Sequence, residues 1–189
     1  MVLNLFAGTL FFGLLHLIPA ALPKHRQKVA EQLGENIYKG IFSIGVLLSI
    51  LLIILGWRGT ETAFVYSPPE WGNLATVILM YPALYLLVAA RVPCRIRRLI
   101  RHPQLTGVFL WALAHLLANG DSRSLTLFGI LALWAPLEMI LLNRRDGIRV
   151  KPATTTLGAD IKVGVIAAVL YIALAYGHVY FTGIALSYS

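Results

Sequence analysis

The chain has 189 residues, of which 58% are hydrophobic and only 13% are charged. Because soluble proteins carry about 25% charged residues, this composition excludes an ordinary soluble domain and is typical of a membrane protein. Lysine and arginine outnumber aspartate and glutamate by 16 to 8, which leaves a net charge of +8. The single cysteine, Cys94, excludes an internal disulfide and any cysteine-rich zinc or iron–sulfur site.

Six apolar segments alternate with charged stretches along the chain. A bilayer core about 30 Å thick needs roughly 20 apolar residues per helix, and five segments come close to that length. The fourth has only 14 residues and is short for a span. We expect an all-α, polytopic membrane bundle of about six transmembrane helices, forming one domain over residues 1–189. The expected helices are residues 2–22, 38–57, 73–90, 105–118, 125–142 and 163–186.

Basic residues are distributed unevenly between alternate loops. The first, third and fifth loops hold 14 of the 16 lysines and arginines, and only Arg58 and Arg123 lie in the others. The positive-inside rule therefore predicts that both termini are periplasmic, in a multi-pass protein of a bacterial inner membrane whose first segment is an uncleaved anchor. The basic loops are expected to attract anionic membrane lipids. Since topology explains the charge, we expect no nucleic-acid partner.

Two histidines lie inside apolar segments, where ionisable side chains are costly and are usually functional or paired. Each ends a stripe of one small residue, one aromatic and one imidazole at i, i+4 and i+8, formed by Gly8, Phe12 and His16 and by Gly107, Trp111 and His115. Two helices with such stripes could hold a planar cofactor such as haem, with one nitrogen from each helix on the iron. Helix packing in a membrane uses the same residue types, so the spacing leaves both interpretations open.

Arg101, His102 and Pro103 open the fourth predicted helix. Proline suits the first helical position, and the residue before a proline is held out of the α region, so we expect His102 at the helix entrance. A helix amino terminus beside guanidinium groups would suit a haem propionate, another cofactor carboxylate or a lipid phosphate. Arginines that only anchor the helix at the interface would give the same pattern.

Residues 101–107 read Arg-His-Pro-Gln-Leu-Thr-Gly, and residues 111–121 run from Trp111 through His115 to Asp121. Together with His16, these segments closely resemble the NnrU family of bacterial inner-membrane proteins, over nearly the whole chain. The resemblance implies a role in denitrification and in nitric-oxide or nitrite metabolism. It also implies nitric oxide or another hydrophobic small molecule as a partner.

The NnrU family is similar in turn to plant zeta-carotene isomerase, a haem b enzyme with two axial histidines. By motif, the likeness implies haem b between the first and fourth helices, with His16 and His115 on the iron. The other residues expected to bind the cofactor are Arg101, His102 and Trp111. The isomerase has a cysteine three residues before its second histidine, and Ala112 stands there in this chain, which argues against a redox exchange of that ligand.

The predicted topology separates the two expected iron ligands in depth. His16 lies about four residues to the cytoplasmic side of its helix midpoint and His115 about four to the outer side, which corresponds to roughly 10–12 Å. Two axial nitrogens on one iron lie only about 4 Å apart. His102 is the alternative partner of His16, because the predicted topology places these two histidines at similar depths in the membrane.

Other functions stay open from the sequence. One is a haem-dependent isomerase similar to the carotenoid enzyme. Another rests on Arg101 and His102 at a helix start and on the carboxylate of Glu138 in the next helix, which resemble membrane methyltransferases that use S-adenosylmethionine. Glu138 also has two interpretations of its own, as a proton carrier and as the ion-pair partner of a cytoplasmic arginine. The sequence is compatible with an enzyme, a sensor or an assembly factor.

Overall fold

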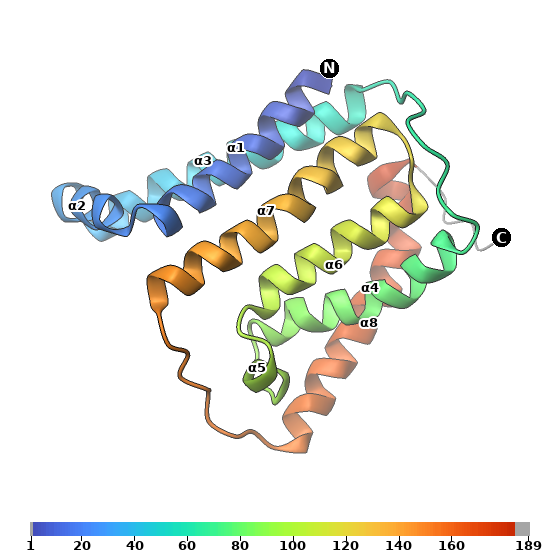
Figure 1. Cartoon of the computed structure of the whole chain (residues 1–189). Helices are drawn as coiled ribbons and strands as arrows, with labels where there is room; N and C mark the ends of the chain where they lie inside the picture. The colour runs from blue at the N-terminus through green and yellow to red at the C-terminus, as the bar shows by residue number, and fades with distance from the viewer. Residues whose placement is uncertain (1, 184–189) are drawn as a thin grey trace. The chain divides into compact units, whose positions relative to one another are not determined.

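The computed structural model describes residues 2–183, and these residues form eight α-helices and one isolated β-bridge, between Phe64 and Asp121 (Figure 1). The all-α prediction is confirmed. The helices are α1 (Val2–Ala21), α2 (Pro23–Leu33), α3 (Glu35–Gly59), α4 (Gly72–Ala89), α5 (Ile96–Leu99), α6 (Pro103–Ala118), α7 (Ser122–Asp146) and α8 (Leu157–Thr182).

Five of the described helices, α1, α3, α4, α7 and α8, are long and apolar enough to cross a membrane. The fourth predicted helix, residues 105–118, corresponds to α6, which is apolar but has only 16 residues. Several helices extend past their predicted ends, because polar and charged residues continue a helix beyond its apolar stretch. The start of α7 is set by Asp121, whose side chain accepts hydrogen bonds from the backbone N–H groups of Arg123 and Ser124, both at 3.0 Å. The predicted end of the last helix, at residue 186, lies outside the described residues.

The chain forms two compact units, neither of them continuous in sequence. The first unit comprises residues 1–65 and 121–148 and contains α1, α2, α3 and α7. The second comprises residues 66–120 and 149–189 and contains α4, α5, α6 and α8. Each unit is described by itself below.

In the first unit, α1 packs closely along α3 through glycines. A Cβ added to Gly8 would come within 2.8 Å of Cβ of Leu52, and one added to Gly56 would overlap the backbone of Leu5. Small residues let helix backbones approach in this way in membrane proteins. Gly8, the small member of the first stripe, therefore serves the packing of α1 on α3.

The short helix α2 connects α1 to α3, where the sequence predicts a loop. Pro23 occupies the start of the helix, where its lack of an N–H costs nothing. Its sequence, PKHRQKVAEQL, is mostly polar, so a search for apolar runs passes over it. The predicted first loop is therefore mostly helical.

In the second unit, α4 packs on α6 and on α8. A Cβ on Gly107 would lie 2.8 Å from the carbonyl oxygen of Ala83, so the small member of the second stripe also serves helix packing. The hydroxyl of Thr76 donates to the carbonyl of Ala114 at 2.6 Å, which ties α4 to α6. The hydroxyl of Tyr171 in α8 donates to the carbonyl of Val77 in α4 at 3.2 Å.

Candidate functional site

His16 is held in a defined orientation on α1. Its Nδ1 lies 2.8 Å from the carbonyl oxygen of Phe12. A carbonyl only accepts hydrogen bonds, so Nδ1 carries the hydrogen and the lone pair of the neutral ring is on Nε2. Three aromatic rings surround the imidazole, with centroid distances of 4.4 Å to Phe12, 5.3 Å to Phe42 and 5.6 Å to Trp134. The stripe predicted on the first helix thus faces α3 and α7.

The imidazole of His16 forms part of the wall of a cavity of about 440 Å³ within the first unit. This volume is in the range of small-molecule sites, which is about 300–1,000 Å³. All four helices of the unit contribute to the lining. The lining residues are His16, Pro19, Ala20, Arg26, Tyr38, Lys39, Phe42, Ser43, Glu138, Leu142 and Arg145.

Basic side chains at this cavity are already partly neutralised by acidic neighbours. Nη2 of Arg26 lies 2.5 Å from Oε1 of Glu35, and Nζ of Lys39 lies 3.5 Å from the same oxygen. The hydrogen bond to Glu35 raises the pKa of the Arg26 guanidinium, which also stacks over the ring of Tyr38 at 4.9 Å. One carboxylate thus orients two cations toward the cavity without cancelling both charges.

Glu138 contributes the buried carboxyl group of the cavity. The residue is 8% exposed, and its Oε2 has no hydrogen-bond partner in the described part of the chain. Nε1 of Trp134, one turn earlier on α7, is likewise buried and without a partner there. Arg145 forms its ion pair with Asp146, at 2.7 Å, and not with Glu138. Within residues 2–183, the expected pairing of Glu138 with a cytoplasmic arginine is not found.

His115 repeats the geometry of His16 in the second unit. Its Nδ1 lies 2.9 Å from the carbonyl oxygen of Trp111, so Nδ1 carries the hydrogen here as well. The ring of Trp111 lies 5.3 Å from the imidazole, centroid to centroid. The side-chain amide of Asn119 donates to the carbonyl of His115 at 2.9 Å and supports the end of α6.

The structure confirms the predicted start of the fourth helix. Pro103 is the first residue of α6 and His102 is its N-cap residue, with φ −120° and ψ 68°, outside the α region. The carbonyl of His102 accepts hydrogen bonds from the backbone N–H and the hydroxyl of Thr106, both at 2.9 Å. Arg101 directly precedes this cap in the sequence.

The predicted site residues are distributed between the two units. His16 belongs to the first unit, whereas His115 and the remaining predicted cofactor residues belong to the second. Glu138 is in the first unit, so the residues of the methyltransferase interpretation are also divided. Arg26, Lys39 and Phe42, which also line the His16 cavity, are not predicted from the sequence. Nothing in their spacing distinguishes them from residues of a loop and of a lipid-facing helix.

A site for a metal ion held by side chains alone needs several ligands. Among residues 2–183, no group of three or more histidine, cysteine, aspartate or glutamate side chains comes together in this way. A haem iron needs only one or two protein ligands, so the histidine geometry described above is the relevant feature.

Comparison with known proteins gives one clear result. The family model described as NnrU protein matches residues 4–186, nearly the whole chain. No curated protein and no solved structure matches the chain. With five helices suited to crossing a membrane and a family match over its length, the chain belongs to the NnrU family of membrane proteins.

Proposed function

We propose that this protein binds haem b in a bacterial inner membrane, with His16 as an iron ligand in the cavity of the first unit. The orientation of His16 carries the proposal. Its Nδ1–H is held by the carbonyl of Phe12, and the cavity of about 440 Å³ lies beside the ring. A hydrogen bond of this kind on one ring nitrogen is typical of metal-bound histidines, because it fixes the tautomer and leaves the other nitrogen as the ligand.

Other residues that line the cavity support the proposal of haem binding. The ring of Phe42 contacts His16 and offers an apolar surface for a planar macrocycle. Arg26 and Lys39 stand at the cavity as partners for two carboxylates, and their shared contact with Glu35 holds them in place. Apolar walls with a few charged groups are what a cofactor site of this size requires.

His115, in the second unit, is the other ligand predicted from the sequence. His115 has the same Nδ1 anchoring as His16, which supports its assignment as a ligand. His102 remains the alternative, since it stands at the start of α6. Trp111 and Arg101 keep their predicted roles as cofactor contacts, the first through its ring and the second through its charge.

Membership of the NnrU family supports a role in denitrification and in nitric-oxide or nitrite metabolism. Haem iron would supply a binding site for nitric oxide or a centre for electron transfer. The protein's own contribution is to fix the imidazole of His16, to surround it with aromatic rings and to place cations at the cavity.

A visible spectrum of the full-length protein tests this proposal. Protein expressed with ample haem and purified in detergent should show a Soret band, and His16→Ala should remove or markedly shift it. His25→Ala is the matched control, because His25 lies on the polar helix α2 and does not line the cavity. Colourless protein, or an unchanged spectrum in His16→Ala, would refute the proposal.

A further inference from the structure

The excess positive charge of the protein is concentrated in the second unit. Outside its two basic segments, residues 91–101 and 149–162, the sequence of this unit contains no lysine or arginine. Asp160 is the only acidic residue within them. The basic residues are Arg91, Arg95, Arg97, Arg98, Arg101, Arg149, Lys151 and Lys162. We call the surface formed by these two segments the basic platform.

The two segments are about 50 residues apart in sequence, but they are joined in the structure. The guanidinium of Arg149 donates to the carbonyl oxygens of Leu99 at 3.1 Å and Ile100 at 3.0 Å, and also to that of Arg97. These carbonyls lie at the end of the short helix α5, where backbone acceptors lack helical partners. Arg149 therefore holds the second segment on the end of α5.

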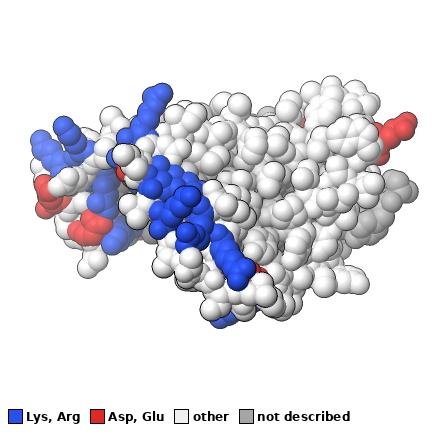
Figure 2. Space-filling view, turned by 60° about the horizontal axis from the view of Figure 1, so that its bottom comes forward, with Lys and Arg blue, Asp and Glu red and all other residues white. Residues whose placement is uncertain are grey.

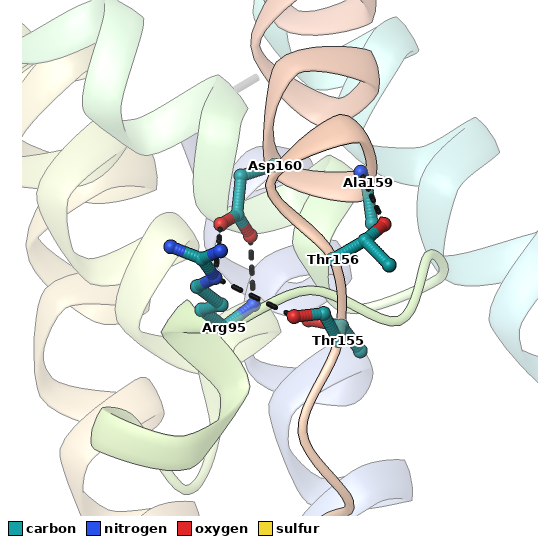
Figure 3. A network of polar contacts seen from close by, with 5 residues as sticks. All are labelled: Arg95, Thr155, Thr156, Ala159 and Asp160. Carbon is teal, nitrogen blue, oxygen red and sulfur yellow. Dashed lines mark hydrogen bonds and ion pairs between the residues drawn. The ribbon is translucent and has the colours of Figure 1, made fainter.

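A second connection runs from Arg95 to the start of α8 (Figure 3). The backbone N–H of Arg95 donates to Oδ1 of Asp160 at 2.8 Å, and its Nε lies 3.2 Å from Oδ2. The same Nε lies 3.5 Å from the carbonyl oxygen of Thr155. The platform is thus a folded surface of defined shape, and Asp160 neutralises one of its cations.

The platform lies where three apolar helices of the second unit begin or end. The helix α4 ends at Ala89, α6 begins at Pro103 and α8 begins at Leu157. Since α4 and α8 are candidate membrane spans, this end of the unit falls at the boundary between the lipid core and the head groups. In Figure 2, lysine and arginine side chains gather over one part of the surface, next to broad areas without charge.

Large apolar side chains are exposed within the platform. Leu99 is 78% exposed, Val150 is 90% exposed and Leu157 is 58% exposed. Exposed apolar residues beside arginine and lysine are typical of segments that lie in the membrane interface, where the apolar groups enter the acyl region and the cations meet phosphates. An anion in solution would account for the cations but not for these apolar side chains.

We propose that the basic platform binds the phosphate groups of anionic phospholipids, with Leu99 and Val150 inserted among the acyl chains. The proposal does not depend on haem and uses no residue that lines the His16 cavity; Arg101, the one platform residue that is also a predicted haem contact, is unchanged in the test below. It predicts a preference for anionic over zwitterionic lipids that depends on the second unit and not on total charge. The amino termini of α6 and α8 add their positive dipole ends at the same boundary.

Spin-labelled lipids provide the test. The full-length protein is reconstituted in phosphatidylcholine vesicles, and the immobilised fraction of spin-labelled phosphatidylglycerol is compared with that of spin-labelled phosphatidylcholine. The platform variant combines Arg97→Gln, Arg98→Gln and Lys151→Gln, which leaves the Arg149 and Asp160 connections intact. The matched control removes three exposed cations from the first unit, with Lys24→Gln, Lys28→Gln and Arg144→Gln.

The wild type should prefer the anionic lipid. The platform variant should reduce this preference by more than about tenfold, since each cation held at the lipid head groups contributes about fivefold. The control variant should lose less than half as much. Equal losses in both variants, or no preference in the wild type, would overturn the proposal.

A salt titration of the wild type gives a measurement without mutation, because about 1 M salt reduces the Debye length to about 3 Å. A preference that survives this salt concentration would also overturn it.

Discussion

Asp160, in the first turn of α8, accepts a hydrogen bond from the backbone N–H of Arg95 at 2.8 Å and forms an ion pair with the Nε of the same residue at 3.2 Å. One carboxylate thus fixes both the backbone and the side chain of a residue 65 positions earlier. The side chain of Asp160 is 19% exposed, so the contact is partly shielded from water. It joins the connection after α4 to the start of α8.

Replacing this carboxylate should destabilise the second unit. Asp160→Asn removes the charge and should lower the free energy of unfolding by about 1–2 kcal/mol, because hydrogen bonds to charged groups are worth more than neutral ones. Thermal unfolding in detergent, followed by circular dichroism, measures the change. Asp146→Asn is the control, because Asp146 pairs at the surface with its neighbour Arg145 and should contribute almost nothing. Equal losses in the two variants would contradict the prediction.

The packing of α1 on α3 gives a prediction with a control on the same helix. Gly56→Ala should destabilise the first unit by several kcal/mol, because the new Cβ would overlap the backbone of Leu5. Gly40→Ala should be neutral or slightly stabilising, since nothing lies within 4 Å of a Cβ there and alanine favours a helix. The unfolding temperatures of both variants test the prediction. An unchanged unfolding temperature for Gly56→Ala would show that α1 and α3 separate easily.

The thiol of Cys94 should be unreactive in the folded protein. It is 2% exposed, and burial raises its pKa, so the thiolate fraction at neutral pH is below that of an ordinary cysteine. A water-soluble maleimide should label it only after denaturation. In a Cys94→Ala background, Lys28→Cys should be labelled at once on the exposed surface of α2. Rapid labelling of the folded wild type would mean that the region around Cys94 opens to solvent.

The predicted orientation of the chain rests on its basic loops and is tested by reporters. A reporter inserted between residues 147 and 156 should read cytoplasmic, and one inserted between residues 60 and 71 should read periplasmic. Only full-length reporter variants that are recovered in the membrane fraction are compared. The opposite reading at both positions would invert the protein and would place the basic platform on the periplasmic side.

The identity of the second haem ligand is decided by comparing two variants. If His115 binds the iron, His115→Ala should shift the Soret band as strongly as His16→Ala does, and His102→Ala should leave it unchanged. The carbonyl of Trp111 orients His115, whereas His102 caps α6 with its backbone. Loss of the band in His102→Ala with a normal spectrum in His115→Ala would assign the ligand to the helix start.

The sequence predicts the apolar helices well, because a span needs a long uncharged run and Pro103 marks a helix start independently of context. It does not predict α2 or α5, since short polar helices lack such a run and α5 depends on carbonyl contacts from Arg149. The sequence shows the stripe that ends at His16, but it does not show which residues of other helices contact the imidazole. Phe42 and Trp134 reach His16 only through the packing of α3 and α7, which no local spacing encodes.

Glu138 is a single residue whose contacts could not be predicted from the local sequence. Its position near several arginines in the sequence favours an ion pair, yet Arg145 lies beside Asp146 and forms its contact there. Local competition for a cation therefore leaves the carboxyl of Glu138 without that partner. A pattern of charges along one helix cannot show which of two carboxylates is nearer in space.

The discontinuity of the first unit has a consequence for its synthesis. The helices α1 and α3 emerge from the ribosome together and can pack through Gly8 and Gly56, but α7 follows only after most of the second unit has been made. Trp134, whose ring contacts His16, and Glu138, which lines the cavity, are therefore added last. Until then the imidazole of His16 has only the partners supplied by α1 and α3, so the cavity cannot be complete in a nascent chain that ends before α7.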